Sequence, residues 1–211
     1  MKQTAAAFVV LVAAIGACSK PPGPPPSAAT PADAPPATAT ASAAQGRVAG
    51  KVHASGTAVV VLEPKTARTF APQTDKPIMD QVGLTFGPEL LLVRTGQPVE
   101  FRNSDDTLHN VHVTHEETRT PAFNVAIPTG SSYNYTFDLD GFYRVGCDIH
   151  PAMAASVFAA TTPYTALAES DGSFTFFDVP SGAWTVTVYT GGKRLHKDVE
   201  VKGGVTEVTI D

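Results

Sequence analysis

The stretch Phe142-Tyr-Arg-Val-Gly-Cys147-Asp-Ile-His150-Pro-Ala-Met153 runs from a short aromatic and β-branched strand into a thiol, an imidazole and a thioether. Gly146 and Pro151 favour a loop after the strand, on which the three side chains can converge. Cysteine, histidine and a weakly bound methionine form a soft ligand set that suits copper, whereas methionine is a poor zinc ligand. The stretch therefore predicts a metal-binding loop that needs one more histidine.

The rest of the region from Arg47 to Asp211 has the alternation of a β-protein and lacks helical apolar spacing. Its short runs are separated by Gly, Pro, Asp and Asn, and strands are expected at residues 57–63, 89–94, 98–102, 111–113, 133–137, 142–145, 156–158, 174–176, 184–189 and 205–210. So many short strands with regular turns indicate an all-β fold of two small β-sandwiches.

The second histidine is expected to be His109, if the sheet folds back on itself. Alternate residues of a strand share a face, so His109 points into the core with Val111, whereas His112 points away. His115 shares the parity of His109 but lies roughly 20 Å along the strand, at about 3.3 Å per residue, which is too far to share a metal. We expect His115 to be a solvated strand-end residue.

The order His109-Asn110 and then Cys147-x-x-His150-x-x-Met153 resembles the ligand pattern of the cupredoxins, with the short spacings of the amicyanins, over about residues 76–160. The resemblance implies a Greek-key β-sandwich that holds one type 1 copper ion. It makes His109, Cys147 and His150 the equatorial ligands and Met153 the axial ligand. It also implies that Asn110 steadies the two ligand segments and tunes the thiolate by hydrogen bonding.

Cys147 has two other interpretations. In an oxidising compartment it could pair with Cys18, the other cysteine of the chain. It could also be a buried, inert thiol on the same strand face as Val145. The closeness of His150 and Met153 favours the metal.

Other polar side chains are expected at the surface. His53 and His196 have no metal-like neighbours, and the pairs Asp105-Asp106 and Glu116-Glu117 are expected to be solvated charges rather than catalytic carboxylates. The sequence has no zinc-peptidase ligand set, nucleophile elbow or phosphate-binding glycine loop, so we do not expect an enzyme.

A second module is indicated on both sides of the copper-ligand pattern. Residues 169–188, with turns at Asp171-Gly172 and Pro180-Ser-Gly182, resemble the second half of carboxypeptidase regulatory-like (transthyretin-like) β-sandwich domains. The first half expected of that family, a Gly-x-Val strand and then an Ala-Val-Val strand, is present at residues 50–52 and 58–62.

The hypothesis that follows is an inserted domain. Residues 47–74 and 161–211 would form the transthyretin-like module, and the cupredoxin domain at residues 75–160 would occupy one of its surface loops, as adjacent domain termini permit. The simpler alternative gives residues 48–63 to the cupredoxin as its first strands.

The first 46 residues have the pattern of an export signal and a tether. Residues 1–17 are expected to be a signal peptide, because the apolar run at residues 5–16 is too short for a bilayer core. Ile15-Gly-Ala-Cys18 resembles the lipobox of bacterial lipoproteins, which implies a lipid on Cys18; the alternative is an ordinary signal that contains a cysteine. Residues 18–46, with eight prolines between Pro21 and Pro36, are expected to be disordered.

The expected function is single-electron transfer by a membrane-anchored blue copper protein in the bacterial periplasm or on the cell surface, with the outer membrane favoured. Its partners are expected to be redox proteins that bind weakly and transiently. The net charge of −5 and the lack of a basic cluster argue against nucleic acid. The alternatives are a copper storage, carrier or sensing lipoprotein without an electron-transfer role, and a structural adhesion lipoprotein.

Overall fold

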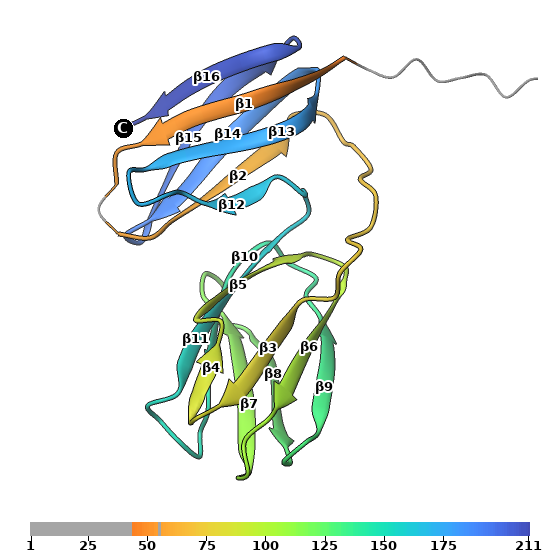
Figure 1. Cartoon of the computed structure of the whole chain (residues 1–211), viewed down its shortest axis with the longest axis vertical. Coiled ribbons are helices and arrows are strands. Elements are labelled where there is room, and N and C mark those ends of the chain that lie inside the picture. The colour runs from red at the N-terminus through yellow and green to blue at the C-terminus, as the bar shows by residue number, and fades with distance from the viewer. Residues whose placement is uncertain (1–43, 55) are drawn as a thin grey trace, which may run out of the picture. The chain divides into compact units, whose positions relative to one another are not determined.

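The computed structural model describes residues 44–54 and 56–211, and Figure 1 shows how their strands are arranged. The expected signal peptide, Cys18 and the tether up to residue 43 lie outside the described residues. The described part contains sixteen strands and no helix, so the prediction of an all-β fold is confirmed. Among the described residues there is accordingly no helix that is long and apolar enough to span a membrane.

Strands β3 to β11 form two sheets, which we name the central sandwich (Figure 1). The sheets have the orders β4-β3-β6-β9 and β5-β11-β10-β7-β8. Met79, Phe101, Val113 and Phe137 are among the side chains of their shared core. The strands are β3 (Ile78–Val82), β4 (Thr85–Gly87), β5 (Leu90–Arg94), β6 (Pro98–Asn103), β7 (His109–His115), β8 (Pro121–Ile127), β9 (Ser132–Thr136), β10 (Gly141–Gly146) and β11 (Ala154–Ala160).

Strands from both ends of the described chain form a second pair of sheets, the terminal sandwich. Its sheets have the orders β13-β1-β16 and β12-β2-β14-β15. The side chain of Trp184 is fully buried in its core, together with Val48, Leu62 and Phe174. The strands are β1 (Gln45–Val52), β2 (Ala58–Pro64), β12 (Thr165–Leu167), β13 (Ser173–Pro180), β14 (Gly182–Thr190), β15 (Lys193–Val201) and β16 (Gly204–Ile210).

The path of the chain through the two sandwiches follows from the pairing of β1 and β2. β2 pairs with β14, with Leu62 opposite Val186, and β1 lies between β13 and β16. The chain thus forms two strands of the terminal sandwich, then the central sandwich, and then the remaining five strands of the terminal sandwich. The insertion hypothesis expects residues 57–63 to pair with the region of residues 184–190, as β2 and β14 do, and the domain assignment itself stays a prediction.

The run of small apolar residues in β2 is explained by burial on both faces of the strand. Val60 and Leu62 point into the core of the terminal sandwich. Val59 and Val61 point the other way, into a cluster with Phe158 of β11. A strand that is buried on both faces has no polar face, so its sequence is continuously apolar rather than alternating.

Several strands were absent from the sequence-based expectation, among them β3, β8 and β15. β15 is the longest of them, and most of its nine side chains are exposed. It is held by the full-length antiparallel pairing with β14, and Leu195, Val199 and Val201 pack against the core of the terminal sandwich. Lys197 interrupts the alternation of these apolar residues, so the strand has only a weak hydrophobic period from which it could be predicted.

Two phenylalanines of β13 allow a test of the packing in the core of the terminal sandwich. Phe174 is 4% exposed and Phe177 is 62% exposed. We expect Phe174→Ala to lower the free energy of unfolding by about 3 to 5 kcal/mol, because it leaves a cavity. The matched control Phe177→Ala should change it by about 0.5 kcal/mol or less. Denaturation followed by the fluorescence of Trp184, in the same core, measures both; equal losses would contradict this packing.

Candidate metal centre

Two neighbouring strands bring the predicted ligand segments together. β7 and β10 pair antiparallel, with Val113 opposite Val145. In an antiparallel pair the start of one strand lies beside the end of the other. His109, the first residue of β7, therefore lies near Cys147, which directly follows β10.

The loop after β10 turns back on itself and carries the second histidine. The Met153 N–H donates to the His150 carbonyl at 2.9 Å, and the Cys147 N–H donates to the Met153 carbonyl at 3.3 Å. These two backbone bonds close a tight loop that carries Cys147, His150 and Met153.

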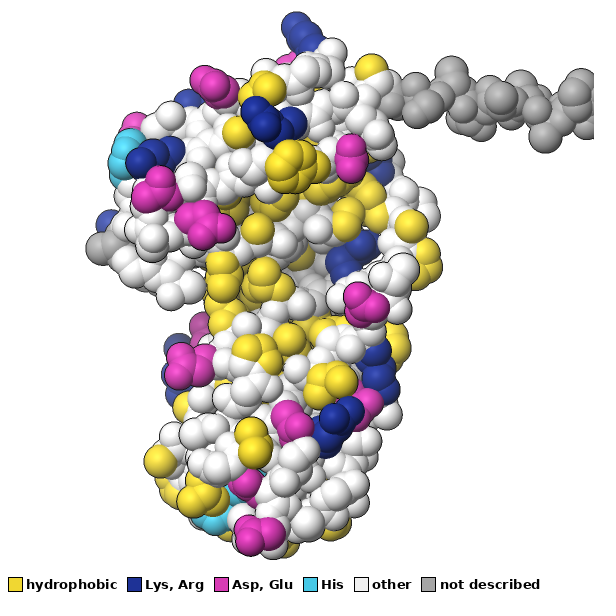
Figure 2. Space-filling view, viewed as in Figure 1, with side chains coloured by type: hydrophobic (Ala, Val, Ile, Leu, Met, Phe, Trp, Pro, Cys, Tyr) yellow, Lys and Arg dark blue, Asp and Glu magenta, His cyan; other side chains and the backbone are white. Residues whose placement is uncertain are grey.

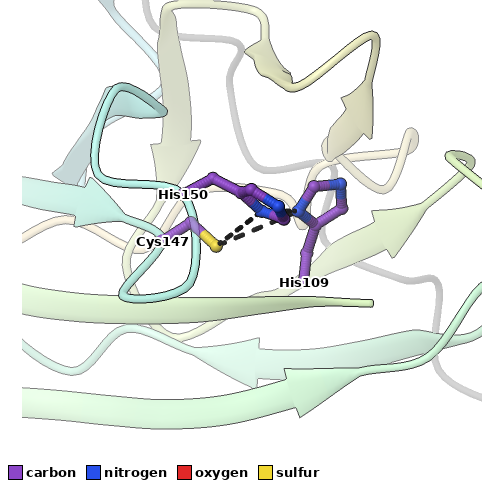
Figure 3. A group of neighbouring side chains, drawn as sticks. All are labelled: His109, Cys147 and His150. Atoms are coloured by element: carbon purple, nitrogen blue, oxygen red, sulfur yellow. Dashed lines mark hydrogen bonds between the residues drawn. The ribbon is translucent and has the colours of Figure 1, made fainter. Parts of the chain in front are cut away.

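The donor atoms of His109, Cys147 and His150 form a compact triangle (Figure 3). The two Nδ1 atoms are 3.0 Å apart. The Cys147 Sγ atom is 3.9 Å from the Nδ1 of His109 and 3.8 Å from the Nδ1 of His150. His109 and Cys147 are buried, and His150 is partly buried.

This triangle has the size of a metal site. A point about 2.0 Å from both nitrogens lies about 2.2 Å from the sulfur, close to the bond lengths of about 2.0 Å to histidine and about 2.3 Å to cysteine known for a first-row metal. Two imidazoles and a thiolate are a donor set that suits copper. The residues present therefore fit a copper ion.

Asn110 links the two segments that carry these donors. Its Oδ1 accepts hydrogen bonds from the Asp148 N–H at 2.7 Å and from the Cys147 thiol at 3.3 Å. Its Nδ2 donates to Asn124 Oδ1 at 2.8 Å and to Asp148 Oδ2 at 3.1 Å, which fixes the orientation of the amide. A thiolate has no proton to donate, so the backbone N–H maintains the link once the sulfur is ionised.

Met153 is buried at the end of the ligand loop, in the same core cluster as Cys147. A buried thioether beside the loop is compatible with the long, weak axial contact of a type 1 copper site. The axial role of Met153 stays a prediction.

The expectation that Asp105 is a solvated charge is wrong. Its side chain is only 12% exposed, and its Oδ2 lies 2.8 Å from the Nε2 of His109. The N–H of Leu84, followed by the His109 ring, lowers the pKa of the Asp105 carboxyl. Sequence reasoning missed this contact because nothing in the Asp105-Asp106 pair distinguishes the residue that turns inward; Asp106 is exposed, as expected.

The first two histidines of β7 lie on opposite faces of the strand, as expected from its alternation. His109 is fully buried, whereas the His112 side chain points outward and is 41% exposed. The Nδ1 of His112 lies 3.0 Å from Asp148 Oδ1. The His112 ring, followed by the Asn124 amide, lowers the pKa of the Asp148 carboxyl.

The expectation that His115 is solvated is wrong. His115 is buried, and its Nε2 lies 3.1 Å from the Asp140 carbonyl oxygen. Its ring packs against the ring of Tyr143. The segment that leads into β10 covers this end of β7, a long-range contact that strand parity does not reveal. His53 and His196 are exposed, as expected, and so are Glu116 and Glu117.

Comparison with known proteins places a family match on the central sandwich. Residues 74–159 match the family described as copper binding proteins of the plastocyanin/azurin family. A reduced amicyanin mutant is 21% identical with a TM-score of 0.38, covering 47% of this chain and 98% of its own. A purple cupredoxin from Nitrosopumilus maritimus is 21% identical with a TM-score of 0.36, covering 40% and 100%.

A copper-containing nitrite reductase from Thermus scotoductus SA-01 is 27% identical with a TM-score of 0.38, and the match covers 46% of this chain and 25% of that enzyme. Comparison with curated proteins gave no match. The family match supports a copper-binding cupredoxin domain in the central sandwich.

The three histidines near the centre differ in a testable way. His109→Ala and His150→Ala should each weaken copper binding strongly, because each removes a donor atom. Loss of a residue that only hydrogen-bonds to a ligand typically weakens metal binding about 10- to 100-fold, and these two losses should be larger. His112→Ala should change copper affinity little, because its ring points outward to Asp148. Competition with a chromophoric copper chelator measures all three. Loss of copper from the His112 variant, with retention by the His109 variant, would reassign the ligand.

Proposed function

We propose that the chain, whose residues 74–159 match the plastocyanin/azurin family of copper-binding proteins, carries single electrons between redox partners through one type 1 copper ion. The observation that carries the proposal is the triangle of His109, Cys147 and His150 donor atoms, closed to the size of a metal site. Met153 is the proposed axial ligand. The chain is proposed as a carrier rather than an enzyme.

The arrangement of these residues suits rapid electron exchange. Bound copper would supply one-electron chemistry between Cu(I) and Cu(II), and a mixed nitrogen and sulfur donor set suits both states. His109 projects from a paired strand, and Asn110 ties that strand to the backbone that follows Cys147. Donors held in this way move little when the charge of the metal changes, so little reorganisation is needed.

An apolar surface beside His150 is the proposed docking site for the partners. Ile149, Pro151 and Ala152 are exposed on the ligand loop, and His150 is only partly buried. Figure 2 shows hydrophobic side chains next to histidine at the tip of the central sandwich. Redox encounters use small interfaces, so fast release of the partner is expected.

The proposal includes the cellular location of the protein. A signal peptide at residues 1–17 would export the chain, and a lipid on Cys18 would anchor it, with residues 18–46 as the tether. The bacterial periplasm or cell surface, with an outer-membrane anchor favoured, is the proposed location. On the face drawn in Figure 2 basic and acidic side chains are interspersed, in keeping with protein rather than nucleic-acid partners.

The terminal sandwich is proposed to be a transthyretin-like module that holds the copper domain as an insert. Support comes from the pairing of β2 with β14 and of β1 with β13 and β16, which joins strands from both sides of the central sandwich. Phe158 of the central sandwich and Tyr189 of the terminal sandwich also lie 4.9 Å apart between ring centroids. We propose a structural role for this module, between the tether and the copper domain.

The visible spectrum tests the type 1 site. The copper-loaded protein is expected to show an intense thiolate-to-copper band, and Cys147→Ser should abolish it, because a hydroxyl is not a thiolate donor. Circular dichroism should show that the variant keeps its β-fold. A colourless copper-loaded wild type, or a blue Cys147→Ser variant, would overturn the proposal. Rapid, reversible one-electron reduction by stopped flow distinguishes a carrier from a copper store.

Substitution of Met153 tests the axial ligand. Met153→Leu is expected to keep copper bound, since a long thioether contact adds little affinity, but to change the reduction potential measured by redox titration. Leucine has nearly the same volume, so packing should be disturbed little. An unchanged potential would mean that Met153 serves the core alone.

A further inference from the structure

The ring of His109 has two polar atoms, and each has one role in the fold. Its Nδ1 faces Cys147 and His150, whereas its Nε2 lies 2.8 Å from the Oδ2 of Asp105. The histidine side chain is completely buried. A buried imidazole that lost this partner would keep a polar nitrogen without a hydrogen bond, which is costly.

The Asp105 carboxylate is itself held in place by the surrounding backbone. It accepts hydrogen bonds from the Gly83 N–H at 2.5 Å and from the Leu84 N–H at 3.0 Å. The Asp105 N–H donates to Asn103 Oδ1 at 3.0 Å. Asn103 is buried, and its Nδ2 donates to the Ile127 carbonyl at 2.7 Å. The carboxylate is therefore aimed at His109 by contacts from several segments.

This geometry selects one tautomer of the histidine. A carboxylate only accepts hydrogen bonds, so a neutral His109 carries its proton on Nε2 and leaves the Nδ1 lone pair directed at the centre. Outer carboxylate partners of ligating histidines also raise the basicity of the ligand. Negative charge near a metal favours its more positive oxidation state.

We propose that Asp105 is a positioning residue that fixes the His109 tautomer and stabilises Cu(II) relative to Cu(I), and so lowers the reduction potential. The proposal rests on the copper site proposed above. Asp106 provides a matched control, because it is the adjacent carboxylate, has the same charge, and is exposed to solvent.

The potential and the affinities are measured on copper-loaded protein. Asp105→Asn is expected to raise the ratio of Cu(I) to Cu(II) affinity about tenfold or more, by analogy with outer-shell substitutions. A tenfold change in this ratio corresponds to a rise of about 59 mV in the reduction potential of a one-electron couple. Asp106→Asn removes the same formal charge where water screens it, and should change the ratio much less.

A second measurement needs no substitution. In the diamagnetic Cu(I) form, nuclear magnetic resonance should detect a downfield Nε2–H of His109 that exchanges slowly with solvent. In Asp105→Asn the same proton should exchange faster. This readout separates the proposal from a turn-capping role for Asp105, which would lower the melting temperature without moving the potential or the proton.

The outcomes separate this inference from the proposed function. A wild type without the thiolate-to-copper band would remove the site and the inference together. A blue wild type whose Asp105→Asn and Asp106→Asn variants have the same potential would overturn the role of Asp105 alone. A rapidly exchanging Nε2–H in the wild type would do the same, even if Asp105→Asn failed to fold.

Discussion

The antiparallel pairing of β7 with β10 is the constraint on which the centre depends. It sets Val113 opposite Val145, and this register brings the first residue of β7 beside the residue that follows β10. A slip of one residue would turn His109 outward and His112 inward, because neighbouring side chains of a strand point to opposite faces. The valines next to the histidines, buried in the central core, hold the register by making such a slip costly.

Burial of the candidate metal donors creates a second requirement, which polar residues around the centre meet. Asn110 and Asp105 satisfy different groups at the site: the first bonds the backbone after Cys147, and the second bonds the Nε2 of His109. Buried polar groups without partners are destabilising, so these contacts stabilise the apo fold and arrange the donors at the same time. The same hydrogen bonds thus serve both stability and chemistry.

The two sandwiches have separate cores, and the candidate metal donors belong to one of them. The donors all lie in the central sandwich, whereas the terminal sandwich has its own core around Trp184. A small apolar cluster, with Val59 and Val61 on one side and Phe158 on the other, connects them. A chain that leaves one sandwich, completes another and returns needs long-range pairing such as that of β2 with β14.

The sequence by itself determined the features that depend on near neighbours: the all-β class, the loop that carries Cys147 and His150, and the inward parity of His109, because alternation and short spacing are local properties. It also indicated a second module with parts on both sides of the copper-ligand pattern. Only the tertiary structure decided that Asp105 rather than Asp106 turns toward His109, and that the segment before β10 buries His115. Both outcomes depend on contacts with segments that are distant in the sequence. The residues next to Asp105 or His115 do not show which distant segment will pack against that side chain.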